Sequence, residues 1–198
     1  MAKFIVTVLM LGLLGGTIYL LTQSKQAYKV LPDINQQLEA DPYGLWRRFD
    51  DPNHYFTAAF PVVPQHATDR IKDELTKQIR QYDMYVASHS DGSVYFIRLI
   101  AYPQNAKLTQ ADLINSVNDD LVRVRAGNQL QSSTSIQFAG RDALKFSITS
   151  DPAQLIEGVA FIEGNNNLYL IAVMANKDLF SSADLDHFLN SFKLTSTK

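Results

Sequence analysis

Apolar and polar positions alternate with a period of two along most of the chain after Tyr55, as is typical of β-strands. In residues 79–89, for example, Tyr82, Met84 and Val86 share one face, and polar residues occupy the other. The pattern predicts main strands over residues 55–62, 79–89, 94–102, 129–138, 143–149, 154–163 and 168–175. Shorter strands are expected at residues 70–75 and 193–195.

Two of these strands are apolar on both faces. Residues 94–102 have the sequence VYFIRLIAY, and residues 168–175 have the sequence LYLIAVMA. A strand that is buried on both sides needs a packed layer on each side of its sheet, so we expect residues 168–175 in the middle of the sheet. Residues 143–149 instead alternate apolar and polar side chains, as an exposed or edge strand does.

The longer of two predicted helices covers residues 107–126. Thr109 is placed to cap its N-terminus, and Asp112, three residues later, gives a near-match to a capping box. Gly127 is placed to take the left-handed position after its C-terminus. Its apolar stripe consists of Leu113, Ile114, Val117, Leu121 and Val124.

The second predicted helix is shorter and is capped by Ser181 or Ser182. Its buried stripe consists of Leu185, Phe188, Leu189 and Phe192. Strands joined mostly by hairpins, together with two amphipathic helices, predict an α+β fold. We expect a mostly antiparallel β-sheet of about six or seven strands with helices packed on it. The globular domain is expected over residues 55–198.

The N-terminal segment is long, apolar and uncharged. As a helix, residues 4–24 would span roughly 30 Å, the thickness of the hydrocarbon core of a bilayer. Residues 1–25 are therefore expected to be a membrane anchor with one transmembrane helix; the alternative is a cleaved signal segment. Residues 26–54, with three prolines, are expected to be a spacer and lead-in. The domain is then expected on the periplasmic side of a bacterial inner membrane, or secreted to the periplasm after cleavage.

Composition excludes several classes of function. The chain of 198 residues has no cysteine, which removes thiolate catalysis, iron–sulfur clusters and thiolate zinc sites. Its 18 basic and 20 acidic residues give a net charge of -2, so a nucleic-acid partner is not expected. No Gly-rich phosphate loop is present either, and no cofactor is expected.

Several packing and turn motifs occur in a distinctive order. Residues 60–64 have the sequence FPVVP, residues 140–143 have GRDA, and residues 188–194 have FLNSFKL. Together with an Asn-rich turn before residues 168–173, LYLIAV, this order resembles bacterial exported domains of the PsbP-like α/β/α sandwich group. The resemblance covers about residues 56–194 and implies that fold. Members of this group look like non-enzymatic binding or assembly modules.

Two loops contain residue types that are found in metal and catalytic sites. Asp50, Asp51 and His54 combine carboxylate oxygens with an imidazole, although acidic turns of this kind are commonly solvated loops. His89 and Asp91 enclose a serine, but neighbours on one turn can hardly form the relay of a hydrolytic triad. The alternative function is therefore a hydrolase, or a small-ligand or metal-binding domain, that uses residues 50–54 and 89–92.

No catalytic motif is visible in the sequence, so the favoured expectation is a protein that is not an enzyme. We expect a membrane-anchored binding or complex-assembly module, with the membrane and an envelope protein as its partners. The partner-binding candidates lie in the lead-in and in two turns: Trp46, Arg47, Arg48, His89, Asp91 and Arg141.

Overall fold

The computed structural model describes residues 41–72, 78–150 and 153–195. The chain divides into two compact units, Met1–Trp46 and Arg47–Lys198, and residues 41–46 are the described part of the first. In this part, the Trp46 backbone N–H donates to the Tyr43 carbonyl at 2.8 Å. The predicted anchor at residues 4–24 lies outside the described residues. None of the helices within the described residues is long and apolar enough to cross a bilayer.

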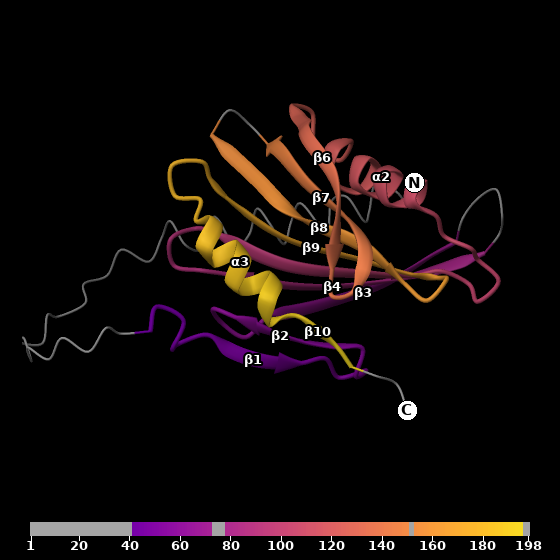
Figure 1. The fold of residues 1–198 in the computed structure, drawn as a ribbon, viewed down its shortest axis with the longest axis horizontal. Coiled ribbons are helices and arrows are strands. Elements are labelled where there is room, and N and C mark those ends of the chain that lie inside the picture. The colour runs from indigo at the N-terminus through magenta and orange to yellow at the C-terminus, as the bar shows by residue number, and fades with distance from the viewer. Residues whose placement is uncertain (1–40, 73–77, 151–152, 196–198) are drawn as a thin grey trace, which may run out of the picture. The chain divides into compact units, whose positions relative to one another are not determined.

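Within the described residues of the second unit, seven strands form one antiparallel sheet in the order β3-β4-β5-β9-β8-β7-β6 (Figure 1). They are β3 (Gln65–Lys72), β4 (Ile79–Ser88), β5 (Val94–Ala101), β6 (Asn128–Phe138), β7 (Arg141–Ser150), β8 (Gln154–Glu163) and β9 (Asn167–Asn176). A smaller antiparallel sheet has the order β1-β2-β10, with β1 (Arg47–Asp50), β2 (Phe56–Phe60) and β10 (Lys193–Leu194). The α+β class and the mostly antiparallel sheet are confirmed.

The strands that are apolar on both faces occupy the centre of the large sheet. β9 lies in the middle of the strand order with β5 beside it, as expected for residues 168–175. The alternating strand β7 is not an edge, because it pairs with β6 on one side and with β8 on the other. Its polar residues, such as Lys145, are exposed on one face of the sheet. The edge strands are β3 and β6.

Two strands differ from their predicted bounds. β3 begins at Gln65, ahead of the predicted start at residue 70, and its predicted end lies outside the described residues. β1 falls within the predicted spacer and lead-in, where Phe49 lies opposite Ala58 of β2. Residues 47–50 are therefore part of the small sheet.

The first helix is shorter than predicted and changes its type. α2 covers Gln110–Val117 and continues as a π-helix, η1, over Asn118–Val122. The Asp112 carboxylate accepts hydrogen bonds from the Thr109 backbone N–H at 2.6 Å and from its hydroxyl at 2.7 Å, so the predicted cap is confirmed. Within the predicted stripe, Leu113 and Val117 are buried, but Ile114 and Val124 are 39% and 44% exposed. A π-turn needs more residues than an α-turn, so Val124, which lies beyond η1, no longer continues the α-helical stripe.

The second helix, α3, covers Ser182–Ser191 and begins as predicted. The Ser181 hydroxyl accepts a hydrogen bond from the Asp184 backbone N–H at 3.1 Å. This bond satisfies one of the N–H groups that a helix leaves unpaired at its start. The predicted stripe is buried: Leu185, Phe188, Leu189 and Phe192.

The large sheet carries a packed layer on each of its faces. On one face, Phe96 of β5 belongs to the same core cluster as Leu113 and Val117 of α2. On the other face, the neighbouring Tyr95 meets Phe188 of α3, with ring centroids 5.4 Å apart. Since adjacent residues of a strand point to opposite faces, α2 and α3 lie on opposite sides of the sheet (Figure 1). Two layers explain why the central strands are apolar on both faces, apart from Arg98 of β5.

Candidate functional site

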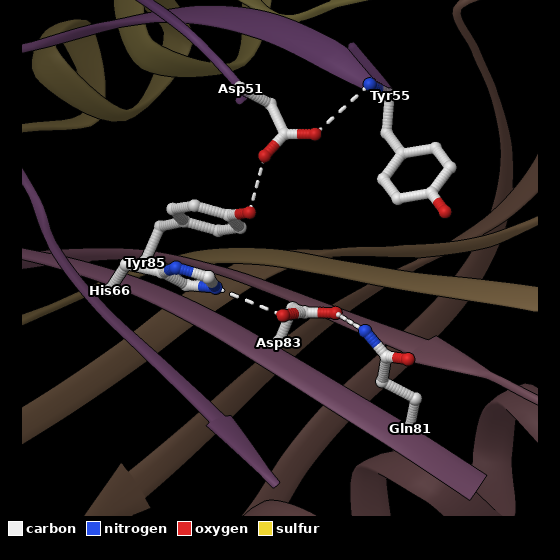
Figure 2. A network of polar contacts seen from close by, with 6 residues as sticks. All are labelled: Asp51, Tyr55, His66, Gln81, Asp83 and Tyr85. Carbon is white, nitrogen blue, oxygen red and sulfur yellow. Dashed lines mark hydrogen bonds and ion pairs between the residues drawn. The ribbon is translucent and has the colours of Figure 1, made fainter. Parts of the chain in front are cut away.

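Two aspartates are buried in the described part of the chain, and both belong to the polar network that Figure 2 shows. Asp51 is 1% exposed and Asp83 is 2% exposed. A buried charge is costly unless it is paired or hydrogen-bonded, so the partners of these carboxylates define what the site can do.

Asp51 follows β1 and closes the turn between β1 and β2. Its backbone carbonyl accepts from the His54 N–H at 2.8 Å, and one carboxylate oxygen accepts from the Tyr55 N–H at 3.0 Å. The other carboxylate oxygen accepts from the hydroxyl of Tyr85, a buried residue of β4. The carboxylate therefore links a local turn of the small sheet to a strand of the large one.

The pKa of Tyr85 is raised well above its usual value of 10.0. Burial is the main cause, because it disfavours the phenolate, and the hydrogen bond to Asp51 acts in the same direction. The hydroxyl therefore stays protonated and donates to the carboxylate over the whole physiological range of pH.

Asp83 lies two residues before Tyr85 and points to the same face of β4. One carboxylate oxygen lies 2.9 Å from Nε2 of His66, and the other accepts from Nε2 of Gln81 at 2.9 Å. His66 of β3 lies opposite Tyr85 in the strand register, and their rings stack with centroids 4.4 Å apart. Asp51 bonds to Tyr85 and Asp83 to His66, so the stacked rings of Tyr85 and His66 connect the two aspartates.

Each carboxylate oxygen in this network already has a donor within the protein. A general base needs to reach a proton on its substrate, and both carboxylates are directed at protein groups instead. The network satisfies two buried charges and holds the turn after β1 against β4. We interpret it as a structural clamp between the two sheets.

The three predicted metal candidates are not brought together. Asp50 is exposed and forms an ion pair with Arg48 at 2.9 Å, whereas Asp51 is buried in the clamp. One carboxylate lies at the surface and the other in the core, so the two do not meet. His54 is exposed and has a φ of +58°. Among the described residues, no group of three or more His, Asp or Glu side chains is arranged to hold a metal ion.

The predicted pair His89 and Asp91 does meet, at the turn between β4 and β5. His89 Nδ1 lies 3.2 Å from Asp91 Oδ1, which also accepts from the Ser93 backbone N–H at 2.8 Å. Burial acts to raise the pKa of Asp91, but the bonds from Ser93 and His89 outweigh it and lower that pKa. Gly92 supplies a φ of +89°. These contacts stabilise a hairpin turn.

The remaining partner-binding candidates occupy separate places. The Trp46 ring meets the ring of Tyr43 edge-on, with centroids 5.6 Å apart. Arg47 is an exposed residue of β1. Arg141, at the start of β7, forms an ion pair with Glu163 and donates to the Ala139 carbonyl at 2.7 Å. Arg141 and Glu163 also line an open depression next to β10. These candidates do not form a common site with the turn at residues 89–93.

Sequence reasoning missed a second, partly buried polar cluster, between η1 and β5. Arg98 of β5 lies 3.2 Å from the Asp120 carboxylate, which also accepts from the Ser116 hydroxyl at 2.7 Å. The Arg98 guanidinium lies 5.0 Å from the ring centroid of Tyr82, within range of a cation–π interaction. One sequence signal was available: a single arginine in an otherwise apolar strand needs a partner. The cluster attaches the π-helix to the sheet.

Sequence reasoning also missed the outer edge of β6. β6 is a terminal strand of the large sheet, and residues 131–135 are all exposed. Its eleven residues, NQLQSSTSIQF, include no charge and no proline. The other edge strand, β3, carries Asp69, Arg70 and Lys72, charges of the kind that discourage pairing.

The β6 edge and the two polar clusters differ in their relation to solvent. The carboxylates of the clusters bond to protein groups, whereas the edge presents exposed residues at the surface. The edge is therefore the surface available to a partner. Neither a protein-family model nor a curated protein matches the chain.

Proposed function

We propose that the protein is a non-enzymatic binding or complex-assembly module of the bacterial envelope. A partner protein would add a strand to the edge of β6 that pairs with no strand among the described residues. The observation that carries this proposal is the contrast between the two edges of the large sheet. β3 carries three charged residues between Asp69 and Lys72, but β6 has none over its whole length.

Strand addition fits the chemistry of β6. An edge strand offers alternate N–H and C=O groups to a partner, and these main-chain bonds supply affinity without a pocket. The exposed side chains of residues 131–135 are Gln, Ser and Thr, which can hydrogen-bond to a partner without adding charge. Proteins usually blunt such edges with charges, proline or bulges, and Ser132–Phe138, the part of β6 beyond its bulge, has none of these, so this part of the edge is a candidate interface.

We further propose that the second unit is a PsbP-like α/β/α sandwich. Support comes from α2 and α3 on opposite faces of the large sheet, and from the motif order at residues 60–64, 140–143 and 188–194. Members of that group look like binding and assembly modules, in agreement with the role proposed for β6.

The proposed location is the periplasmic side of the inner membrane, with residues 4–24 as a single-pass anchor. The uncharged run of these residues supports the anchor. Intact mass and membrane fractionation of the native protein test it. A full-length mass in the membrane fraction is expected, and a mass that lacks the N-terminal segment would point to a protein released into the periplasm.

Site-specific photo-crosslinking tests the role of the β6 edge. A photoreactive residue replaces Thr134 in β6, and a matched variant carries it at Thr68 in β3, since both threonines are exposed. In intact cells, we expect position 134 to give a protein adduct of discrete mass and position 68 to give none. The absence of an adduct at position 134, or equal labelling at both positions, would contradict the proposed function.

A further inference from the structure

We propose that the strand added to β6 is β6 of a second copy of this chain, paired antiparallel about a two-fold axis through Ser135. This inference rests on the proposed function, because it names the partner of the same edge. The symmetric pairing would join two large sheets into one continuous sheet.

Symmetry restricts the register of such a pairing. Residues that face each other across an antiparallel pair have side chains on the same side of the sheet. A two-fold axis perpendicular to the sheet keeps every residue on its own side. One residue must therefore lie opposite its own copy, and its neighbours pair symmetrically around it.

A bulge selects the part of β6 that can pair in this way. The β6–β7 register shifts between Leu130 and Ser132, so the regular part of β6 is Ser132–Phe138. A bulge also turns side chains before it to the other face, which prevents pairing through it. The middle residue of Ser132–Phe138 is Ser135.

The backbone N–H and C=O groups of Ser135 also point away from β7, as pairing with a second copy requires. Ala139 and Gly140 form a two-residue turn, with φ of 50° and 75°, between Phe138 and Arg141. In hairpins closed by such a turn, the flanking residues form a hydrogen-bonded pair, and the pattern then alternates along the strand. This alternation directs the N–H and C=O groups of Ser133, Ser135 and Gln137 away from β7.

The side chains in this register are compatible with one another. Ser135 faces Ser135 of the second copy, Thr134 faces Ile136, and Ser133 faces Gln137. Hydroxyl pairs and β-branched pairs favour cross-strand contact, and no like charges oppose each other. In the other edge strand, β3, a centre at Asp69 would instead place two carboxylates face to face.

A contact of this length is weak in dilute solution. Tethering two copies to one membrane raises their effective concentration, so pairing needs no large additional interface. The full-length chain in its own membrane is therefore the proper test sample.

Cysteine cross-linking tests the register directly, because the chain has no cysteine of its own. We expect Ser135→Cys to form a disulfide-linked dimer in membranes treated with copper–phenanthroline. Facing residues of a hydrogen-bonded pair have Cα atoms about 5.5 Å apart, within the range of a disulfide. Ser133→Cys and Gln137→Cys should each stay monomeric alone, since like positions are four residues or roughly 13 Å apart. Their co-expression should restore the dimer.

Thr68→Cys in β3 is the matched control and should stay monomeric. The proposal is overturned if Ser135→Cys gives no dimer, or if Thr68→Cys gives as much. If Ser135→Cys gives no dimer but the photoreactive residue at position 134 cross-links to a different protein, the assembly function holds and its partner is that protein. If position 134 gives no adduct at all, both proposals fail.

Charge exchange gives a second measurement without oxidation. Ser135→Lys and Ser135→Glu, each expressed separately as two distinguishably tagged copies and chemically cross-linked in the membrane before solubilisation, should each lose the co-purification of the two tags that the unsubstituted chain shows. Expressed together, the two variants should recover it, because opposite charges then face each other. Unchanged co-purification of the separate variants would overturn the register.

Discussion

Replacing Tyr85 with phenylalanine removes one hydroxyl group from the clamp between the two sheets. The aromatic ring, its burial and its stacking on His66 are retained. The lost group is the hydroxyl that donates to the Asp51 carboxylate. The variant therefore tests a single hydrogen bond to a buried charge.

The expected cost follows from the burial of both partners. Hydrogen bonds to charged groups contribute about 1.5–3 kcal/mol, and water cannot replace the lost donor where Asp51 is 1% exposed. We expect the free energy of unfolding to fall by about 2–3 kcal/mol. For a domain of this size, such a loss lowers the melting temperature by about 4–12 °C.

Urea denaturation followed by circular dichroism measures this loss, with Tyr55→Phe as the matched control. Tyr55 uses its backbone N–H, not its ring hydroxyl, to bond Asp51, and its side chain is partly exposed. Its variant should change the free energy of unfolding by less than about 0.5 kcal/mol. Equal, small effects of the two variants would refute the clamp.

A double-mutant cycle separates the bond from the burial of each residue. If Tyr85 and Asp51 interact directly, the combined variant Tyr85→Phe/Asp51→Asn should be less destabilised than the sum of the single variants. A coupling of about 1–2 kcal/mol is expected for residues in contact. Additive losses would show that the hydroxyl and the carboxylate contribute independently.

Three further outcomes are expected from local geometry. Gly158→Ala should destabilise the protein by about 2–3 kcal/mol in urea denaturation, because a Cβ there would overlap the carbonyl oxygen of Ile171. Ser181→Ala should cost about 1 kcal/mol by loss of the α3 cap, whereas Ser182→Ala should cost little, both measured by urea denaturation. Burial raises the pKa of Tyr102 to about 12 against the pull of Arg80. The Tyr102 hydroxyl therefore ionises at a lower pH in the unfolded chain than in the folded one. The urea midpoint should fall as pH rises from 10 to 12, and it should fall less steeply in Tyr102→Phe.

The central part of the fold could be predicted because its signal is local. A strand such as β9, apolar on both faces, must lie between two layers wherever the chain places it. Helix starts are local as well, since the Asp112 carboxylate accepts from the Thr109 N–H and the Ser181 hydroxyl accepts from the Asp184 N–H, each three residues apart. These features need no knowledge of distant contacts.

The position of a strand within the sheet depends on contacts that no local pattern contains. β7 alternates like an edge strand, yet β6 covers its side, and nothing in residues 143–149 indicates the neighbour. The edge could have been suspected from composition alone: β6 has no charge over Asn128–Phe138, whereas β3 carries three charged residues between Asp69 and Lys72.

The different surroundings of residues 50–54 could not be predicted from the sequence for a related reason. Asp50 and Asp51 are chemically identical in the sequence, but β1 directs one to water and the other to the core. What separates their roles is the Tyr85 hydroxyl, 34 residues further along the chain. A carboxylate in an acidic turn can bind metal, stay solvated or join a buried clamp, and the distant donor decides among these. A substitution at Tyr85 should therefore perturb the hydrogen bonding of the Asp51 carboxylate more than any substitution at the neighbouring Asp50.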